Sequence, residues 1–188
     1  MQIEYASKEQ YLDSQAAGDI TIYSLYFAYL DYLRALLPYS IDLQKMDGPS
    51  FSQTATCEVN IAIEDKNTDL VLFRDYESLI GFAVLGHAPN SYHAMDTYIQ
   101  EFYVLDAFQR QGFGRKIMQE LVKIDPSTDW SLFILEDNKP AIRFWNTVMP
   151  ELGYEDISRS LTPPRSEDFE PKEASFIWQY WKKQTKEK

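Results

Sequence analysis

The stretch Val104-Leu105-Asp106-Ala107-Phe108-Gln109-Arg110-Gln111-Gly112-Phe113-Gly114-Arg115 joins a predicted strand to a predicted helix. Its two glycines let the backbone approach a ligand without a Cβ in the way. The first N–H groups of the helix lack partners within the helix and carry the positive end of its dipole. Arg110, Arg115 and Lys116 add positive charge, so the stretch predicts an anion site.

Other phosphate-binding loops match this stretch less well. A dinucleotide-binding fingerprint needs a third glycine at position 117, where the chain has Ile117. A nucleotide P-loop needs Gly-Lys followed by Ser or Thr, which the stretch lacks. A plain helix start, with glycines chosen for tight packing, stays open as the alternative.

The segments that follow the stretch alternate between helix and strand patterns. A strand at Tyr98–Val104 leads into the stretch, and Gly112–Ile124 carries apolar residues at helical spacing. Trp130–Leu135 predicts the next strand. Asn138 then caps a helix that runs to about Val148.

The preceding half of the chain predicts a hairpin and two helices. Asp69–Arg74 and Leu79–Gly86 form the hairpin strands, joined by a turn at Asp75–Ser78. The remaining expectations are a strand at Ile3–Tyr5, a helix from Ile20 to about Leu36 capped by Asp19, a loop at Tyr39–Gln53, and a segment at Ala55–Lys66 that fits strand or helix, with helix preferred.

The C-terminal segments Ile157–Leu161 and Ser175–Tyr180 predict a closing hairpin around the link Thr162–Lys172. Hairpin strands therefore come first along the chain, and strand–helix units follow. This order predicts an α+β fold whose central sheet is antiparallel in part and covered by helices.

Composition favours one globular domain with small-molecule or peptide partners. The chain has 188 residues, 45% of them apolar, and a net charge of −11. Such an acidic chain repels nucleic acid and anionic membranes. Cys57 is the single cysteine, which excludes an internal disulfide and argues strongly against a cysteine-based metal site. The N-terminus lacks a signal-peptide pattern, so the expected location is cytoplasmic.

Two spaced blocks resemble the GNAT superfamily of N-acetyltransferases. The first is Gln109-Arg110-Gln111-Gly112-Phe113-Gly114, preceded by the apolar strand Ile99–Val104; the second is Asn138, Ala141 and Trp145, followed by Gly153-Tyr154. Their order and separation make the resemblance specific. It implies a mixed, partly antiparallel sheet of about six to seven strands flanked by about four helices.

The resemblance also implies one domain over 1–188. Residues 1–68 would form a helical region on the acceptor side, 69–161 the coenzyme-binding core, and 162–188 a closing strand and tail. Acetyl-CoA is the implied cosubstrate, and no metal is implied. Members of this family are often dimers, which leaves a homodimer open.

The family's coenzyme contacts carry over to matching positions. The Val104 backbone N–H would hydrogen-bond the thioester carbonyl, and Asn138 would contact the pantetheine arm. The backbone N–H groups that would take the pyrophosphate belong to Gln109, Arg110, Gln111, Gly112, Phe113, Gly114 and Arg115.

Glu101 is the candidate general base, since many family members have a glutamate near this point of the strand. The alternative is a structural carboxylate paired with a basic neighbour. Strand alternation places Glu101 on the face opposite Phe102 and Val104, unless a bulge intervenes. Trp145 stands where many members have a tyrosine acid, so either another tyrosine such as Tyr154, or solvent, would protonate the leaving thiolate.

The implied reaction is direct transfer of an acetyl group to a primary amine of a small molecule or peptide. The alternative function is an acyl-CoA-binding sensor or regulatory module without turnover. A cationic amine is one option, because six acidic residues precede the coenzyme strand; the alternative is that these charges only keep the protein soluble. They are Glu58, Glu64, Asp65, Asp69, Asp75 and Glu77. His87 and His93 could border the acceptor pocket, although surface positions are the simpler interpretation.

Overall fold

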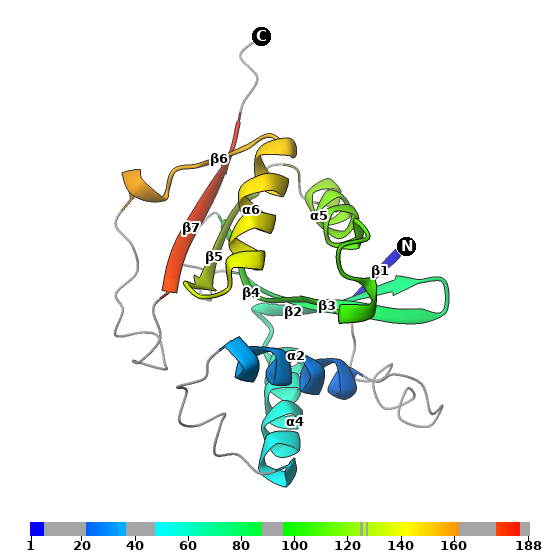
Figure 1. The fold of residues 1–188 in the computed structure, drawn as a ribbon. Helices are drawn as coiled ribbons and strands as arrows, with labels where there is room; N and C mark the ends of the chain where they lie inside the picture. The colour runs from blue at the N-terminus through cyan, green and yellow to red at the C-terminus, as the bar shows by residue number, and fades with distance from the viewer. Residues whose placement is uncertain are drawn as a thin grey trace.

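The computed structural model describes residues 1–5, 22–36, 48–87, 96–124, 126, 128–161 and 176–184 (Figure 1). The elements in chain order are β1 (Gln2–Tyr5), α2 (Ile22–Leu36), α4 (Gly48–Glu64), β2 (Thr68–Asp75), β3 (Ser78–Gly86), β4 (Asp96–Val104), the 3₁₀ turn η1 (Asp106–Phe108), α5 (Phe113–Ile124), β5 (Asp129–Leu135), α6 (Lys139–Glu151), β6 (Tyr154–Asp156), the 3₁₀ turn η2 (Ser158–Ser160) and β7 (Phe176–Lys183).

The seven strands form one mixed sheet in the order β1-β2-β3-β4-β5-β7-β6. Every neighbouring pair is antiparallel except β4 and β5, which are parallel. Helices α5 and α6 cover one face of the sheet, and α2 and α4 lie on the other (Figure 1). The structure thus confirms the α+β prediction.

Strand alternation divides the core into two layers. In β2, Val71 and Phe73 point toward α5 and α6, whereas Leu70 and Leu72 point toward α2 and α4. Of the predicted apolar stripe on α5, Ile117 and Leu121 are almost fully covered by the sheet, whereas Ile124 at the end of the helix is exposed. Both faces of the central strands are therefore buried.

Two predicted boundaries were wrong. Helix α4 begins at Gly48, so the loop predicted through Gln53 ends earlier; a proline such as Pro49 is tolerated in the first helical turn, where its missing N–H has no helical partner. The closing strand is Tyr154–Asp156 rather than Ile157–Leu161. Asp156 accepts a hydrogen bond from the Ser158 backbone N–H at 2.9 Å, which turns the chain there.

Several predictions fall outside the described residues: the Asp19 cap, the loop from Tyr39 to position 47, the link Thr162–Lys172 and His93. Within the described ranges, no helix is both long and apolar enough to cross a membrane.

Position 81 requires glycine because the backbone of the neighbouring strand lies too close for a side chain. A Cβ at this position would lie 2.3 Å from the carbonyl oxygen of Tyr103. We predict that Gly81→Ala lowers the free energy of unfolding by about 1–3 kcal/mol, the usual range for overpacking, as measured by urea denaturation. The exposed Ser78→Ala on the same hairpin should change it by less than about 0.5 kcal/mol. Equal stability of the two variants would contradict this packing.

Candidate functional site

Strands β4 and β5 separate after a short parallel stretch. They pair from Asp96–Ile99 to Asp129–Leu132, but β4 continues to Val104 and β5 to Leu135. A bulge in β4 between Ile99 and Glu101, opposite the Val84/Leu85 step of β3, bends the strand where the separation begins. Beyond that point β5 stays paired with β7 while β4 stays paired with β3, so a splay opens between them.

The Val104 N–H points into this splay. The next residue, Leu105, donates its N–H to the Ile80 carbonyl oxygen of β3 at 2.9 Å. Successive strand residues direct their backbone groups to alternate edges, so the N–H and carbonyl of Val104 face away from β3. The side-chain amide of Gln109 donates to that Val104 carbonyl at 2.8 Å, whereas the Val104 N–H is directed into the splay.

The loop after β4 has the backbone geometry of an anion site. Arg110 and Gly112 adopt left-handed conformations, with φ of 57° and 84°. Lys116 donates its N–H to the Gly112 carbonyl, so α5 opens here and its first N–H groups face outward. A Cβ on Gly112 would meet no atom within 4 Å, so the space before the helix start is open.

Gly114 has a different role from Gly112. A Cβ on Gly114 would lie 3.0 Å from the Phe144 ring of α6 and 3.9 Å from the ring of Phe102. Phe102 and Phe144 stack with centroids 5.7 Å apart. The glycine therefore permits close packing of α6 against α5, which was the alternative explanation for this residue.

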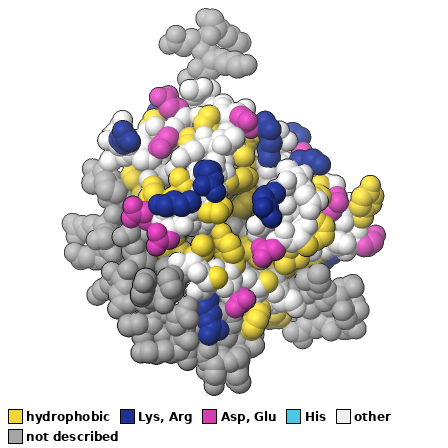
Figure 2. All heavy atoms as spheres, in the orientation of Figure 1, with side chains coloured by type: hydrophobic (Ala, Val, Ile, Leu, Met, Phe, Trp, Pro, Cys, Tyr) yellow, Lys and Arg dark blue, Asp and Glu magenta, His cyan; other side chains and the backbone are white. Residues whose placement is uncertain are grey.

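Basic residues border the loop on both helices. Arg110 and Lys116 are exposed on the α5 side, and Lys139 and Arg143 are exposed on α6. On this face of the molecule, Lys and Arg side chains lie on both sides of an apolar strip between the two helices (Figure 2). The Arg115 side chain instead forms an ion pair with Glu151 at 2.6 Å. The Arg115 backbone N–H is then the group that this residue adds to the predicted anion site.

Glu101 lies on the opposite face of the sheet, beneath α2. The bulge precedes it, so alternation from Glu101 to Val104 is regular, with Phe102 and Val104 facing α5 and α6. The Tyr29 hydroxyl of α2 donates a hydrogen bond to Glu101 Oε2. This pair, 72 residues apart in the sequence, brings α2 against the bulged part of β4.

Asn138 holds the other side of the splay. Its side-chain oxygen caps α6 by accepting from the Ala141 N–H at 3.1 Å, as predicted, and also accepts from the Tyr32 hydroxyl at 3.0 Å. The Tyr32 ring tilts against Tyr103 with centroids 5.9 Å apart. Burial is the main cause that raises the pKa of Tyr32, so its hydroxyl stays protonated and able to donate.

Sequence reasoning did not identify Tyr29 and Tyr32 as site residues. They lie one helical turn apart on α2 and reach the two walls of the splay, at Glu101 and Asn138. The available signal was the presence of hydroxyl-bearing rings on an apolar helix face, where such groups need partners.

Two residues considered for proton donation lie elsewhere. Trp145 is buried on α6 and packs edge-on against Phe102 with centroids 5.2 Å apart, a core role. Tyr154 is buried in β6, which β5 and β7 separate from β4, and its hydroxyl accepts from Trp130 Nε1 at 3.3 Å. Trp130 pairs with Thr97 at the start of β4, whereas Val104 is at its end, so this position argues against a role for Tyr154 at the thioester.

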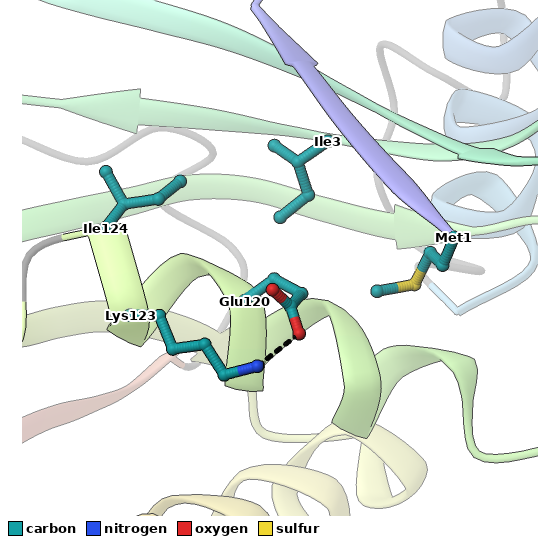
Figure 3. Close-up of a pocket in the computed structure, with 5 residues that line it drawn as sticks. All are labelled: Met1, Ile3, Glu120, Lys123 and Ile124. Carbon is teal, nitrogen blue, oxygen red and sulfur yellow. Dashed lines mark hydrogen bonds and ion pairs between the residues drawn. The ribbon is translucent and has the colours of Figure 1, made fainter.

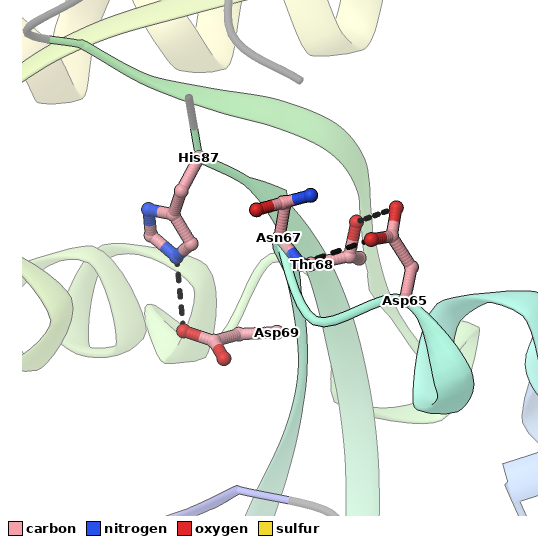
Figure 4. Close-up of polar contacts among 5 residues, drawn as sticks. All are labelled: Asp65, Asn67, Thr68, Asp69 and His87. Carbon is pink, nitrogen blue, oxygen red and sulfur yellow. Dashed lines mark hydrogen bonds and ion pairs between the residues drawn. The ribbon is translucent and has the colours of Figure 1, made fainter. Parts of the chain in front are cut away.

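Asp65 and Asp69, two of the acidic residues that precede β4, have partners near the ends of β2 and β3. The Asp69 carboxylate lies 2.9 Å from His87 Nε2 (Figure 4). The Asp65 carboxylate accepts hydrogen bonds from the Asn67 backbone N–H and the Thr68 hydroxyl. Asp69 shares the α5 side of β2 with Val71, the face opposite Glu101. His87 is therefore a surface residue away from Glu101. In the described part of the chain, no three His, Cys, Asp or Glu side chains gather as a metal site requires.

A surface hollow of about 300 Å³ lies between β1 and the end of α5 (Figure 3). It is lined by Met1, Ile3, Glu120, Lys123 and Ile124. Glu120, Lys123 and Ile124 lie toward the C-terminal end of α5, whereas the loop Gln109–Gly112 precedes its N-terminal end. The hollow is therefore separate from the splay.

Comparison with known proteins agrees with this geometry. The model of the acetyltransferase (GNAT) family matches residues 31–148, well over half of the chain. None of the curated proteins compared with the sequence matches it.

Solved acetyltransferases share the fold. The N-acetyltransferase of Staphylococcus aureus has a TM-score of 0.61 and 10% identity, covering 96% of this chain and 99% of its own. The PaiA N-acetyltransferase of Thermoplasma acidophilum, solved with coenzyme A, has a TM-score of 0.58 and 14% identity over 98% and 100% of the two chains. An acetyltransferase of Thermus thermophilus has a TM-score of 0.56 and 11% identity over 96% of each chain.

The tyrosines at the splay predict a loss of stability at alkaline pH. Burial, together with nearby acidic groups, raises the pKa of Tyr29 and Tyr103 above the usual 10.0. The folded protein keeps these protons while the unfolded chain releases them, so the stabilisation is complete below pH 10 and is lost as pH rises further. Urea denaturation between about pH 8 and about pH 11 measures this loss.

The double variant with Tyr29→Phe and Tyr103→Phe is the comparison for this measurement. It should lose less stability over the same pH range, because neither ring can release a proton. An identical decline in both proteins would mean that other groups cause the alkaline destabilisation.

Proposed function

Because the chain belongs to the GNAT family of acetyltransferases, we propose that it transfers an acetyl group from acetyl-CoA to a primary amine of a small molecule or peptide. The amine attacks directly while both substrates are bound. The observation that supports this best is the splay itself. The Val104 N–H points into the splay from its edge, the anion loop lies on one face of the sheet, and Glu101 lies on the other.

The residues present fit the coenzyme. The open helix start at Gln109–Arg115 suits the pyrophosphate, and the exposed side chains of Arg110 and Lys116 suit its charge. Asn138 already uses its side-chain oxygen twice, so we assign its Nδ2 group to the pantetheine arm. The Val104 N–H donates to the thioester carbonyl and stabilises the negative charge that develops there.

Glu101 performs the proton transfer in this proposal. An ammonium group has no lone pair, so a base must take a proton before or during the attack. The Glu101 carboxylate takes one proton from the ammonium group, which frees the nitrogen lone pair. The nitrogen then bonds to the thioester carbon, the carbon–sulfur bond breaks, and the second proton that the nitrogen loses passes to solvent. The positions of Trp145 and Tyr154 favour protonation of the thiolate by solvent, and a free thiolate is a tolerable leaving group near neutral pH.

The surroundings of Glu101 favour a cationic amine. Tyr29 and Tyr103 lie beside it with centroids 5.6 Å apart, and the Tyr103 hydroxyl donates to Asp106 at 3.3 Å. Aromatic faces and carboxylates both attract cations. The proposal of a cationic acceptor therefore rests on Glu101, Asp106 and the two tyrosine rings. It no longer rests on the six acidic residues earlier in the chain.

The coenzyme assignment predicts that Gly112→Val prevents binding of acetyl-CoA. The side chain would fill the open space before α5, and the residue would leave its left-handed conformation. Gly153→Val is the matched control, because Gly153 has the same φ of 84° at the far end of α6. Calorimetric titration should show binding to the control and not to Gly112→Val. Equal affinity in the two folded variants would remove the loop from the site.

The base assignment predicts that Glu101→Gln lowers turnover by roughly 10²–10⁴-fold while coenzyme affinity hardly changes. Thiol release from acetyl-CoA across a panel of amines provides the measurement. The exposed Glu155→Gln on β6 is the control and should behave like the unaltered protein. Near-normal turnover of Glu101→Gln at saturating amine would make Glu101 a structural residue. Binding of acetyl-CoA without thiol release for any amine would favour a sensor.

A further inference from the structure

Tyr29 contacts the candidate base from the α2 side of the sheet. Its hydroxyl donates to Glu101 Oε2, and its ring is held by three aromatic neighbours. Tyr26 and Phe82 contact it edge-on, each with centroids 5.7 Å away, and Tyr103 lies tilted at 5.6 Å. Because packing fixes the ring, it also fixes the direction from which the hydroxyl reaches the carboxylate.

This contact bears on the charge of the carboxylate. A hydroxyl that donates to an ionised carboxylate stabilises the ionised form, and here it donates to Oε2. We propose that Tyr29 is a positioning residue that orients the Glu101 carboxylate and keeps it ionised, so that the carboxylate takes the proton of the attacking amine. This inference rests on the proposed function, in which Glu101 is the base.

Tyr29 keeps its own proton throughout. The amine N–H bond breaks and the proton passes to the Glu101 carboxylate, while the phenol continues to donate to Oε2. In support, burial first and the charge of Glu101 second raise the pKa of Tyr29 well above 10.0. The phenol is therefore a permanent donor near neutral pH.

The titratable groups that the described residues place near the pair include acids and phenols. They are Tyr26, Asp31 and Tyr32 from α2, Tyr98 and Tyr103 from β4, and Asp106 from η1. None of these named groups is a cation, and negative charge among them disfavours an ionised Glu101. A hydroxyl donor is the kind of partner that keeps a carboxylate ionised in such surroundings.

The test compares Tyr29→Phe with Tyr23→Phe. Tyr23 is also on α2 and donates to Asn60 of α4 at 3.2 Å, so the control loses an equivalent hydroxyl away from Glu101. The side-chain carboxyl of Glu101 is followed by ¹³C NMR against pH, and Glu101→Gln identifies its signal. In Tyr29→Phe the Glu101 titration should move upward by about one to two pH units; in Tyr23→Phe it should not move.

Turnover provides the second measurement on the same proteins. The acid limb of kcat/KM should move upward with the carboxyl titration in Tyr29→Phe, while the KM for acetyl-CoA changes little. A merely structural tyrosine would lower stability and leave the limb in place. An unchanged Glu101 titration in folded Tyr29→Phe overturns the proposal, as does an unmoved limb.

A reciprocal measurement covers the case in which Tyr29→Phe does not fold. In Glu101→Gln, ¹³C NMR of the tyrosine rings should show a lower pKa for Tyr29, because the neighbouring charge is gone. An unchanged Tyr29 pKa overturns the pairing. Both titrations are made without any amine, so absence of acetyl transfer in the unaltered protein would contradict the proposed function while the titrations still decide the Tyr29–Glu101 pairing.

Discussion

The whole site depends on the place where parallel pairing stops. Two adjacent parallel strands normally satisfy each other's backbone groups along their length. Here β4 and β5 do so only as far as Ile99 and Leu132, because a bulge bends β4 while β5 follows its antiparallel partner β7. Beyond the bulge, the β4 backbone groups that point away from β3, such as the Val104 N–H, face the splay, and a ligand that carries hydrogen-bonding groups can satisfy them.

The splay also separates two environments of opposite charge. On the α5 face, a helix start and exposed basic residues form a cationic region in a chain of net charge −11. On the α2 face, Glu101 and Asp106 lie among tyrosine rings. Helix α2 links the two walls, since Tyr29 bonds to Glu101 and Tyr32 bonds to Asn138. A polyanionic coenzyme and a cationic amine would therefore meet from opposite sides of one sheet.

The sequence predicted those features of the structure that depend on residues close together in the chain. The glycine-containing helix start, the Asn138 cap and the hairpin of β2 and β3 all depend on neighbours within a few positions, and each was confirmed. The bonds of Tyr29 and Tyr32 join residues 72 and 106 positions apart, and no periodicity in one segment reports such pairs. Gly114 shows the same limit, because the group that requires a glycine there is the Phe144 ring of another helix. The start of α4 was missed because a Gly-Pro pair fits both a turn and a first helical turn.

The most direct test of the account is a crystal structure of the protein with acetyl-CoA. The account predicts that the pantetheine arm lies between β4 and β5, that the pyrophosphate contacts the backbone of Gln109–Arg115, and that the thioester carbonyl accepts a hydrogen bond from the Val104 N–H. Acetyl-CoA bound elsewhere, for example in the hollow between Met1 and Lys123, or bound with its thioester away from Val104, would contradict it.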